Sequence, residues 1–367
     1  MTNARISRRS FVSGLVASGV MAGALVSGVA HAAEVAGSSA KDGERSARAA
    51  SASSAKDAAS SSAADAAAFP VTITHVFGET VIERAPERVA TLEWGNQDAV
   101  LALGVAPVGC SAANFGVKEG EKLLPWTREA FADLGVSDPN VFDDTDGYDF
   151  EAVSDCRPDL ILAPYGGMTA EDYAQFTKIA PTVTYPTTAW ATPWRDQIRI
   201  TGRALGRERE AAALVASLEA TIADEAAAHG VSGQNVAFFS ISATDLSTIY
   251  IYVPNDPRCA YLEDLGFTTP KSVRDLTGDT KDFYIQVSAE EADRLSDVAC
   301  IVTYGDDAFV DQLRADPLLS LIPAIADGRV VALDGTSSLA ASVNPTALSM
   351  PATIDEYLGL IQKALEK

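Results

Sequence analysis

The stretch PERVATLEWGNQDAVLALGVAPVGC, residues 86–110, carries the alternation that decides the fold. A short apolar run from Arg88 to Glu93 comes first. Apolar residues at helical spacing, Ala99 and Leu103 among them, follow it, and a second short run spans Pro107 to Cys110. Short apolar runs on either side of a helical stretch are typical of a parallel sheet with helices on its faces. The stretch therefore predicts a strand–helix–strand unit of an α/β protein.

The same alternation recurs along the rest of the chain, where two further runs flank a helical stretch from Thr169 to Ile179 and four more follow. These runs are Asp159 to Ala163, Thr182 to Tyr185, Asn235 to Ile241, Ile249 to Val253, Ala299 to Tyr304 and Val330 to Leu333. The pattern predicts two Rossmann-like α/β lobes with mainly parallel sheets, residues 69–205 and 231–367. Gly78-Glu79, between alternating runs, predicts a tight hairpin at the start of the first lobe.

Two helices are expected between the lobes. Thr192-Pro193 has the pattern of an N-cap followed by proline at the first helical position, and predicts a helix to about Leu205. The connecting helix follows at residues 206–230. Its apolar stripe consists of Leu214, Val215, Leu218 and Ile222. Because a single long helix is a stiff joint, we expect only small lobe motion when a ligand binds.

The first 68 residues carry signals for export. The twin-arginine pattern SRRSFV, residues 7–12, is followed by an apolar run and the small-residue site Ala30-His31-Ala32. Residues 1–32 are predicted to be a Tat signal peptide, with a retained anchor from Phe11 to Ala30 as the alternative. Residues 33–68 are rich in Ala and Ser, and are predicted to be a disordered linker. The protein is expected in the periplasm or at the cell surface.

Charge and cysteine content narrow the class of protein. A formal net charge of −22 repels phosphate backbones, so nucleic acid is not expected as a partner. In an oxidising compartment Cys110 could pair with Cys156, and Cys259 with Cys300. Tat substrates fold in the reducing cytoplasm, and Cys300 lies inside an apolar run, so four buried free thiols are the alternative. Both possibilities stay open at this point.

Common catalytic and metal-binding patterns are missing from the sequence, which has no G-x-S-x-G elbow, P-loop or G-x-G-x-x-G turn. Only His75 and His229 follow the predicted signal, and both are expected to be surface or helix-end residues without a metal. The acidic run from Asp143 to Gly147 is expected to be a polar turn. A secreted enzyme that uses Glu93 and Asp306 as paired acids is a less favoured alternative, as is a tethered adhesin.

Seven segments after Phe69 carry a family resemblance. They are HVFGET (75–80), PERVA (86–90), QDAVLALGV (97–105), residues 148–163, KIAPTV (178–183), DPR (256–258) and residues 324–334. In this order they resemble the substrate-binding proteins of ferric-siderophore ABC importers, a family that also includes cobalamin and haem binders. The resemblance implies two α/β lobes joined by a single long helix, with the ligand in a cleft between them.

The resemblance also implies what the protein works with. The ligand would be a ferric siderophore, whose own oxygens surround the iron, so no cofactor and no metal ligand from the protein are expected. The partners would be the membrane subunits of an ABC permease, and the protein itself would be a monomer without enzymatic activity. Haem or cobalamin is the alternative ligand within the same transporter class.

Candidate ligand residues lie where predicted strands end, because the loops after the carboxyl ends of strands form the site in open α/β sheets. Aromatic faces and a cation suit a chelate held through its outer surface. The candidates are Trp94, Tyr165, Trp190, Tyr252, Arg258 and Tyr304. Lys118 and Arg128 are weaker candidates, and Trp194 is assigned to packing.

Two glutamates are candidates for docking on the permease. In the family that the sequence resembles, an exposed acid on each lobe pairs with permease arginines, and Glu151 and Glu290 match those positions. The alternative is ordinary helix-start chemistry, since acids favour the first turn of a helix. Ser288 and Glu291 are expected to form a capping box, which leaves Glu290 for docking.

Overall fold

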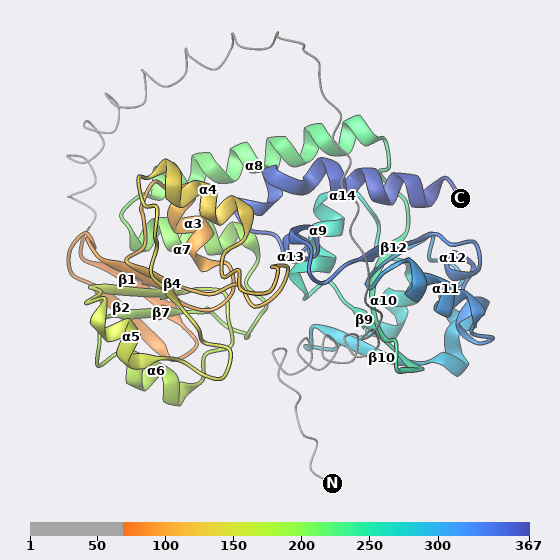
Figure 1. Cartoon of the computed structure of the whole chain (residues 1–367), viewed down its shortest axis with the longest axis horizontal. Coiled ribbons are helices and arrows are strands. Elements are labelled where there is room, and N and C mark those ends of the chain that lie inside the picture. Colours follow the sequence, from red (N-terminus) through yellow and green to blue (C-terminus); the bar gives the residue numbers. More distant parts are fainter. Residues whose placement is uncertain (1–68) are drawn as a thin grey trace, which may run out of the picture.

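The computed structural model describes residues 69–367, and it has two α/β lobes at either end of the long helix α8 (Glu208–His229), which Figure 1 shows along one side of the molecule. The signal peptide and linker predicted for residues 1–32 and 33–68 lie outside the described residues. Within residues 69–367, no helix has both the length and the apolar character needed to cross a membrane. The predicted class, two α/β lobes joined through a long helix, is confirmed.

The N-terminal lobe contains a five-stranded sheet in the order β5-β4-β3-β6-β7, in which every pair of neighbouring strands is parallel. Its strands are β3 (Val89–Thr91), β4 (Gly109–Ser111), β5 (Val141–Phe142), β6 (Leu160–Ala163) and β7 (Thr182–Thr184), and its helices are α3 (Asn96–Ala102), α4 (Pro125–Asp133), α5 (Phe150–Asp155) and α6 (Ala170–Phe176). The short β5 was not predicted, because two residues give no period.

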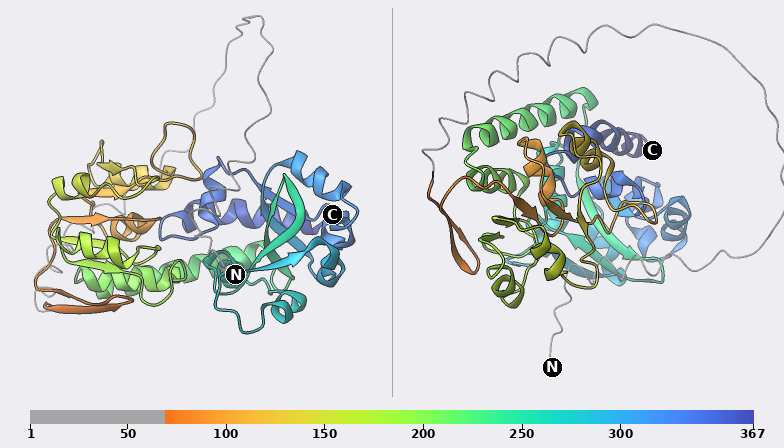
Figure 2. Two further views of the ribbon diagram at one scale, coloured as in Figure 1. Left: turned by 90° about the horizontal axis from the view of Figure 1, so that it is seen from below. Right: turned by 60° about the vertical axis from the view of Figure 1, so that its left-hand side comes forward.

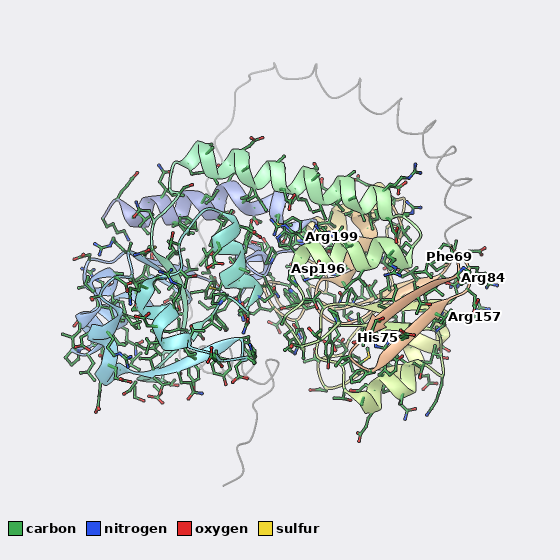
Figure 3. All side chains as sticks on the ribbon, turned by 180° about the vertical axis from the view of Figure 1, so that it is seen from behind. Phe69, His75, Arg84, Arg157, Asp196 and Arg199 are labelled. Atoms are coloured by element: carbon green, nitrogen blue, oxygen red, sulfur yellow. The ribbon has the colours of Figure 1, made fainter. Side chains whose placement is uncertain are left out.

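The predicted hairpin is present as β1 (Val71–His75) and β2 (Gly78–Ile82), but the expectation that His75 is a surface residue is wrong. His75 is buried, and its Nε2 lies 2.9 Å from Thr80 Oγ1 and 3.3 Å from Tyr173 Oη (Figure 3). The hairpin lies against the lobe, so alternate side chains of β1 point inward.

The C-terminal lobe contains a second five-stranded sheet, in the order β10-β9-β8-β11-β12. Its elements are β8 (Val236–Ser242), β9 (Asp245–Tyr252), α9 (Pro257–Asp264), α10 (Lys271–Thr277), β10 (Tyr284–Ser288), the 3-10 helix η1 (Ala289–Leu295), β11 (Cys300–Tyr304), α11 (Asp307–Ala315), the 3-10 helix η2 (Leu319–Leu321), α12 (Pro323–Ala326), β12 (Val330–Leu333), α13 (Ser338–Ser342) and α14 (Ser349–Leu365). In this sheet β9 is antiparallel to both of its neighbours, because Ala243 and Thr244 are too short a connection for a parallel crossover.

The joint between the lobes is a continuous apolar core. α8 buries Val215 from its predicted stripe in a hydrophobic cluster that also contains Leu160 of the first lobe and Phe238 of the second. α14 lies beside α8 and adds Ile361 to the same cluster (Figures 1 and 2). Since separating the lobes would expose this shared core, the joint resists bending.

The helix before α8 begins one residue later than predicted. α7 spans Trp194–Ala204, its N-cap is Pro193, and the Thr192 side chain makes no capping hydrogen bond. The assignment of Trp194 to packing is confirmed, because its side chain is buried and its Nε1 donates to Asp264 of α9 at 2.8 Å. Arg195 of α7 also pairs with Asp264, at 2.9 Å. These contacts link α7 to the second lobe.

The disulfide pairing considered for the four cysteines is wrong, and the alternative of buried free thiols is confirmed. Cys110 and Cys156 are both free, and they belong to different hydrophobic clusters. Burial raises the pKa of the Cys110, Cys259 and Cys300 thiols to about 12. These thiols are therefore packing groups and not reactive nucleophiles at neutral pH.

Candidate ligand-binding site

Two acidic side chains, Glu93 and Asp144, lie at the carboxyl ends of the strands of the N-terminal lobe. The backbone N–H of Glu93, after β3, donates to Ser111 Oγ of β4 at 2.9 Å, and Ser111 Oγ donates to Asp144 Oδ2 at 2.7 Å. Tyr148 Oη donates to Glu93 Oε1. Glu93 and Asp144 are both buried. This end of the sheet therefore carries a hydrogen-bonded group of carboxyl and hydroxyl oxygens.

Two residues at this end of the lobe hold an unusual backbone conformation. Glu93 has φ of 68° and Trp190 has φ of 62°, in the left-handed region that side chains with a Cβ rarely occupy. Both pack on the same glycine pair: a Cβ at Gly166 would lie 2.7 Å from Glu93 Cδ, and one at Gly167 would lie 2.3 Å from Trp190 Nε1. Costly conformations of this kind cluster at functional sites.

The C-terminal lobe surrounds a buried guanidinium with aromatic rings. Arg258, in the first turn of α9, is 3% exposed and pairs with Asp256, with Nη2 2.8 Å from Oδ2 and Nε 2.9 Å from Oδ1. Its guanidinium carbon lies 3.6 Å from the centre of the Tyr252 ring, and Nη1 lies 3.3 Å from Tyr304 Oη. Three of the predicted candidates therefore form one group at the ends of β9 and β11.

Phe115 joins the two halves of the site. Its ring meets the edge of Tyr304 with 5.2 Å between ring centres, so a loop of the first lobe contacts the end of β11 in the second. Trp94 and Phe115 pack against one apolar cluster, which includes Trp126. Phe115 was missed in the sequence, because it lies in a loop without strand or helix periodicity.

The six predicted ligand residues fall into three places. Tyr165 and Trp190 meet edge to face in the first lobe, with ring centres 5.5 Å apart. Tyr252, Arg258 and Tyr304 form the group described above. Trp94 is half-buried beside Phe115. The two weaker candidates, Arg128 and Lys118, are both exposed. Arg128 has its Nη2 3.7 Å from Glu121 Oε1.

Asp306, one of the two acids of the enzyme alternative, caps a helix. Its Oδ1 accepts from the backbone N–H of Phe309 at 2.8 Å, at the start of α11.

Among residues 69–367, the ligand atoms of Glu225, His229 and Asp355 lie close enough together to hold a cation. The group is on α8 and α14, where His229 Nε2 lies 3.0 Å from Asp355 Oδ1 and links the two helices. The Asp355 side chain is 84% exposed, so the group is a surface contact apart from the strand ends.

The two docking candidates occupy exposed first turns, one in each lobe. Asp149 caps α5 by accepting from the Ala152 N–H at 2.9 Å, so the helix start does not need Glu151. The predicted capping box at Ser288 is wrong, because Ser288 Oγ accepts from the Glu290 N–H at 3.3 Å. Within the part of the chain that the structure describes, the Glu151 and Glu290 carboxylates take no hydrogen bond or ion pair.

Two α/β lobes, a long connecting helix and polar and aromatic residues at the strand ends define the class of two-lobed binding proteins. Residues 89–336 match the family model described as periplasmic binding protein, and the chain belongs to that family.

Relatives with a known ligand or structure agree with the family. The structure of PiaA from Streptococcus pneumoniae in complex with ferrichrome is 44% identical, covers 81% of this chain and 99% of its own, and superposes with a TM-score of 0.77. The ferric enterobactin-binding protein FepB of Escherichia coli is 28% identical, over 73% of this chain and 85% of its own. The Fe(3+)-citrate-binding protein YfmC of Bacillus subtilis is 26% identical, over 70% and 76%.

Proposed function

We propose that the protein captures a ferric siderophore outside the cytoplasmic membrane and delivers it to an ABC importer. The observation that carries the proposal is the aromatic cage around Arg258, with Tyr252 and Tyr304, at the strand ends of a chain 44% identical to a ferrichrome-binding protein. Rings and a guanidinium suit the outer surface of a chelate. Iron enters as part of the ligand and keeps the oxygen shell that the siderophore supplies.

Export and partners are part of the same proposal. Residues 1–32 serve as a Tat signal, and the mature protein acts as a monomer in the periplasm or at the cell surface. FepB is a periplasmic protein, and a further relative, YfiY of Bacillus subtilis, is a probable siderophore-binding lipoprotein, which supports a place outside the cytoplasm. Glu151 and Glu290, exposed on opposite lobes, contact the permease.

The charge of the site favours a chelate of low net charge. Arg258 is already neutralised by Asp256, so the aromatic cage itself offers no net positive charge to a ligand. A ligand with a large negative charge would therefore gain little electrostatic attraction from the paired guanidinium. A tris-hydroxamate balances the charge of ferric iron, whereas a tris-catecholate leaves it strongly negative. The ligand class is therefore a neutral ferric hydroxamate such as ferrichrome.

Tryptophan fluorescence tests this ligand class. Ferrichrome, ferric enterobactin, ferric citrate, haem and cobalamin are titrated separately into the purified protein. Saturable quenching by ferrichrome at the lowest concentration supports the proposal. Tight binding of ferric enterobactin with no binding of ferrichrome would exclude the hydroxamate class, and binding of haem or cobalamin alone would overturn siderophore capture.

Trp94→Ala and Trp190→Ala are each expected to weaken ferrichrome capture by roughly 1–3 kcal/mol, because each removes an aromatic contact at the strand ends. The matched control is Trp194→Phe, which loses the hydrogen bond to Asp264 and some stability but leaves ferrichrome affinity unchanged. Affinities come from the same quenching titration. Wild-type affinity in both alanine variants would remove Trp94 and Trp190 from the site.

A further inference from the structure

The segment that follows β12, residues 334–349, belongs to the C-terminal half of the chain but forms hydrogen bonds with the N-terminal lobe. It runs from the residue after β12 to the first residue of α14, and Figure 1 shows its helix α13 between the two lobes. The backbone N–H of Gly116 donates to Gly335 O at 3.0 Å, and Asn344 Nδ2 donates to Tyr165 Oη at 3.1 Å. The second of these bonds reaches a candidate ligand residue.

A buried hydrogen bond anchors the segment. Thr346 Oγ1 donates to Asp98 Oδ2 at 2.6 Å, and the Asp98 side chain is fully buried within α3. Asp98 also accepts from Trp126 Nε1 at 2.9 Å and from Thr127 Oγ1 at 2.7 Å, both on α4. One carboxylate thus ties together α3, α4 and a segment of the C-terminal half.

Two glycines let the segment approach closely. A Cβ at Gly95 would lie 2.8 Å from Thr346 Cγ2, and one at Gly116 would lie 2.4 Å from the Cβ of Ala341. Gly95 directly follows Trp94, and Ala341 belongs to the cluster on which Trp94 packs. A displacement of Thr346 therefore acts directly on the loop that carries Trp94.

We propose that residues 334–349 form a clasp between the lobes, in which Thr346 and Asp98 are positioning residues for the Trp94 loop. The clasp then holds the lobes together in addition to α8 and the α7–α9 contacts, and a hinge motion about α8 would have to break the Asp98–Thr346 hydrogen bond. The effect on ligand capture rests on the proposed function, whereas the effect on the loop does not.

Because Asp98 is titratable, the clasp can be followed through the pH dependence of the protein's stability. Burial raises the pKa of Asp98 to about 6, although its three donors oppose the rise. In the unfolded chain the pKa is 3.8, so the folded state binds more protons and its stability falls as pH rises from 3.8 to about 6. Above that value the contribution is constant. Cys110, a thiol whose raised pKa is due in part to Asp98, stays neutral in this window.

Three threonine variants test the clasp. Thr346→Val keeps the shape but removes the donor, and Thr346→Ser keeps the donor. Thr201→Val is the control, because Thr201 is also buried, on α7, and its hydroxyl has no partner among the described residues. Hydrogen exchange in residues 92–101 of the ligand-free protein is expected to be about tenfold faster in Thr346→Val only. In that variant alone, the pH at which stability levels off moves upward, because Asp98 has lost a donor to its charged form.

The affinity for ferrichrome is measured on the same variants, and about a tenfold loss is expected in Thr346→Val. If Thr346→Val does not fold, Asn344→Ala replaces it, with exchange followed at residues 164–168. Unchanged exchange in a folded Thr346→Val, with an unchanged pH profile, would overturn the clasp. Faster exchange in a protein that binds no chelate would support the clasp and refute the proposed function instead.

Discussion

Arg258→Met is expected to lower ferrichrome affinity by about 2–4 kcal/mol, the range of an interface hot spot, because it removes the guanidinium from the aromatic cage. The same change leaves the Asp256 carboxylate buried without its ion pair, so we also expect a loss of about 3–5 kcal/mol in the free energy of unfolding. Fluorescence titration measures the first effect, and urea unfolding measures the second.

The double variant Arg258→Met, Asp256→Asn separates binding from folding. An asparagine at position 256 can still accept from the backbone N–H of residue 258 and cap α9. Neither position 256 nor position 258 then carries a buried charge. Most of the lost stability should return, while ferrichrome affinity stays low. If the double variant binds ferrichrome as tightly as the unchanged protein, Arg258 does not contact the ligand.

Charge reversal at both docking acids is expected to abolish uptake without a change in ligand affinity. Glu151→Lys with Glu290→Lys replaces an exposed negative group on each lobe by a positive one, and like charges at an interface oppose permease arginines. Uptake of ⁵⁵Fe-ferrichrome by cells that carry the cognate permease measures the loss.

The matched control reverses two other exposed acids, one in each lobe, Glu171 and Glu291. Glu171 lies in the first turn of α6, and Glu291 pairs with Arg294 beside Glu290. The control changes net charge by the same amount, so its uptake should remain normal. Equal loss of uptake in both double variants would mean that overall charge, and not a docking contact, is responsible.

The parallel parts of the fold could be predicted from local pattern, because a buried parallel strand is a short apolar run next to a helical period. The unit β3–α3–β4 and the strand β12 were found in this way. β9 was taken as one more parallel strand, since its antiparallel direction is set by the two-residue connection Ala243-Thr244, which has no glycine or asparagine to signal a hairpin. β10 was missed.

The candidate site likewise contains residues that a local sequence pattern could predict and residues that it could not. Arg258, Tyr252 and Tyr304 were placed by the rule that strand ends form the site, and the structure brings them together. Phe115 was not predicted, because it lies in a loop that has no strand or helix periodicity. Thr346 and Asp98 meet across 248 positions of the chain, and a contact of that range leaves no local trace in one sequence.

X-ray absorption at the iron edge, recorded on the protein saturated with ferrichrome, tests the central claim most directly. The account predicts that iron keeps the oxygen shell of the free chelate, with distances unchanged on binding, because the protein contacts only the outer surface of the ligand. Nitrogen ligands, or protein oxygens in place of siderophore oxygens, would contradict it.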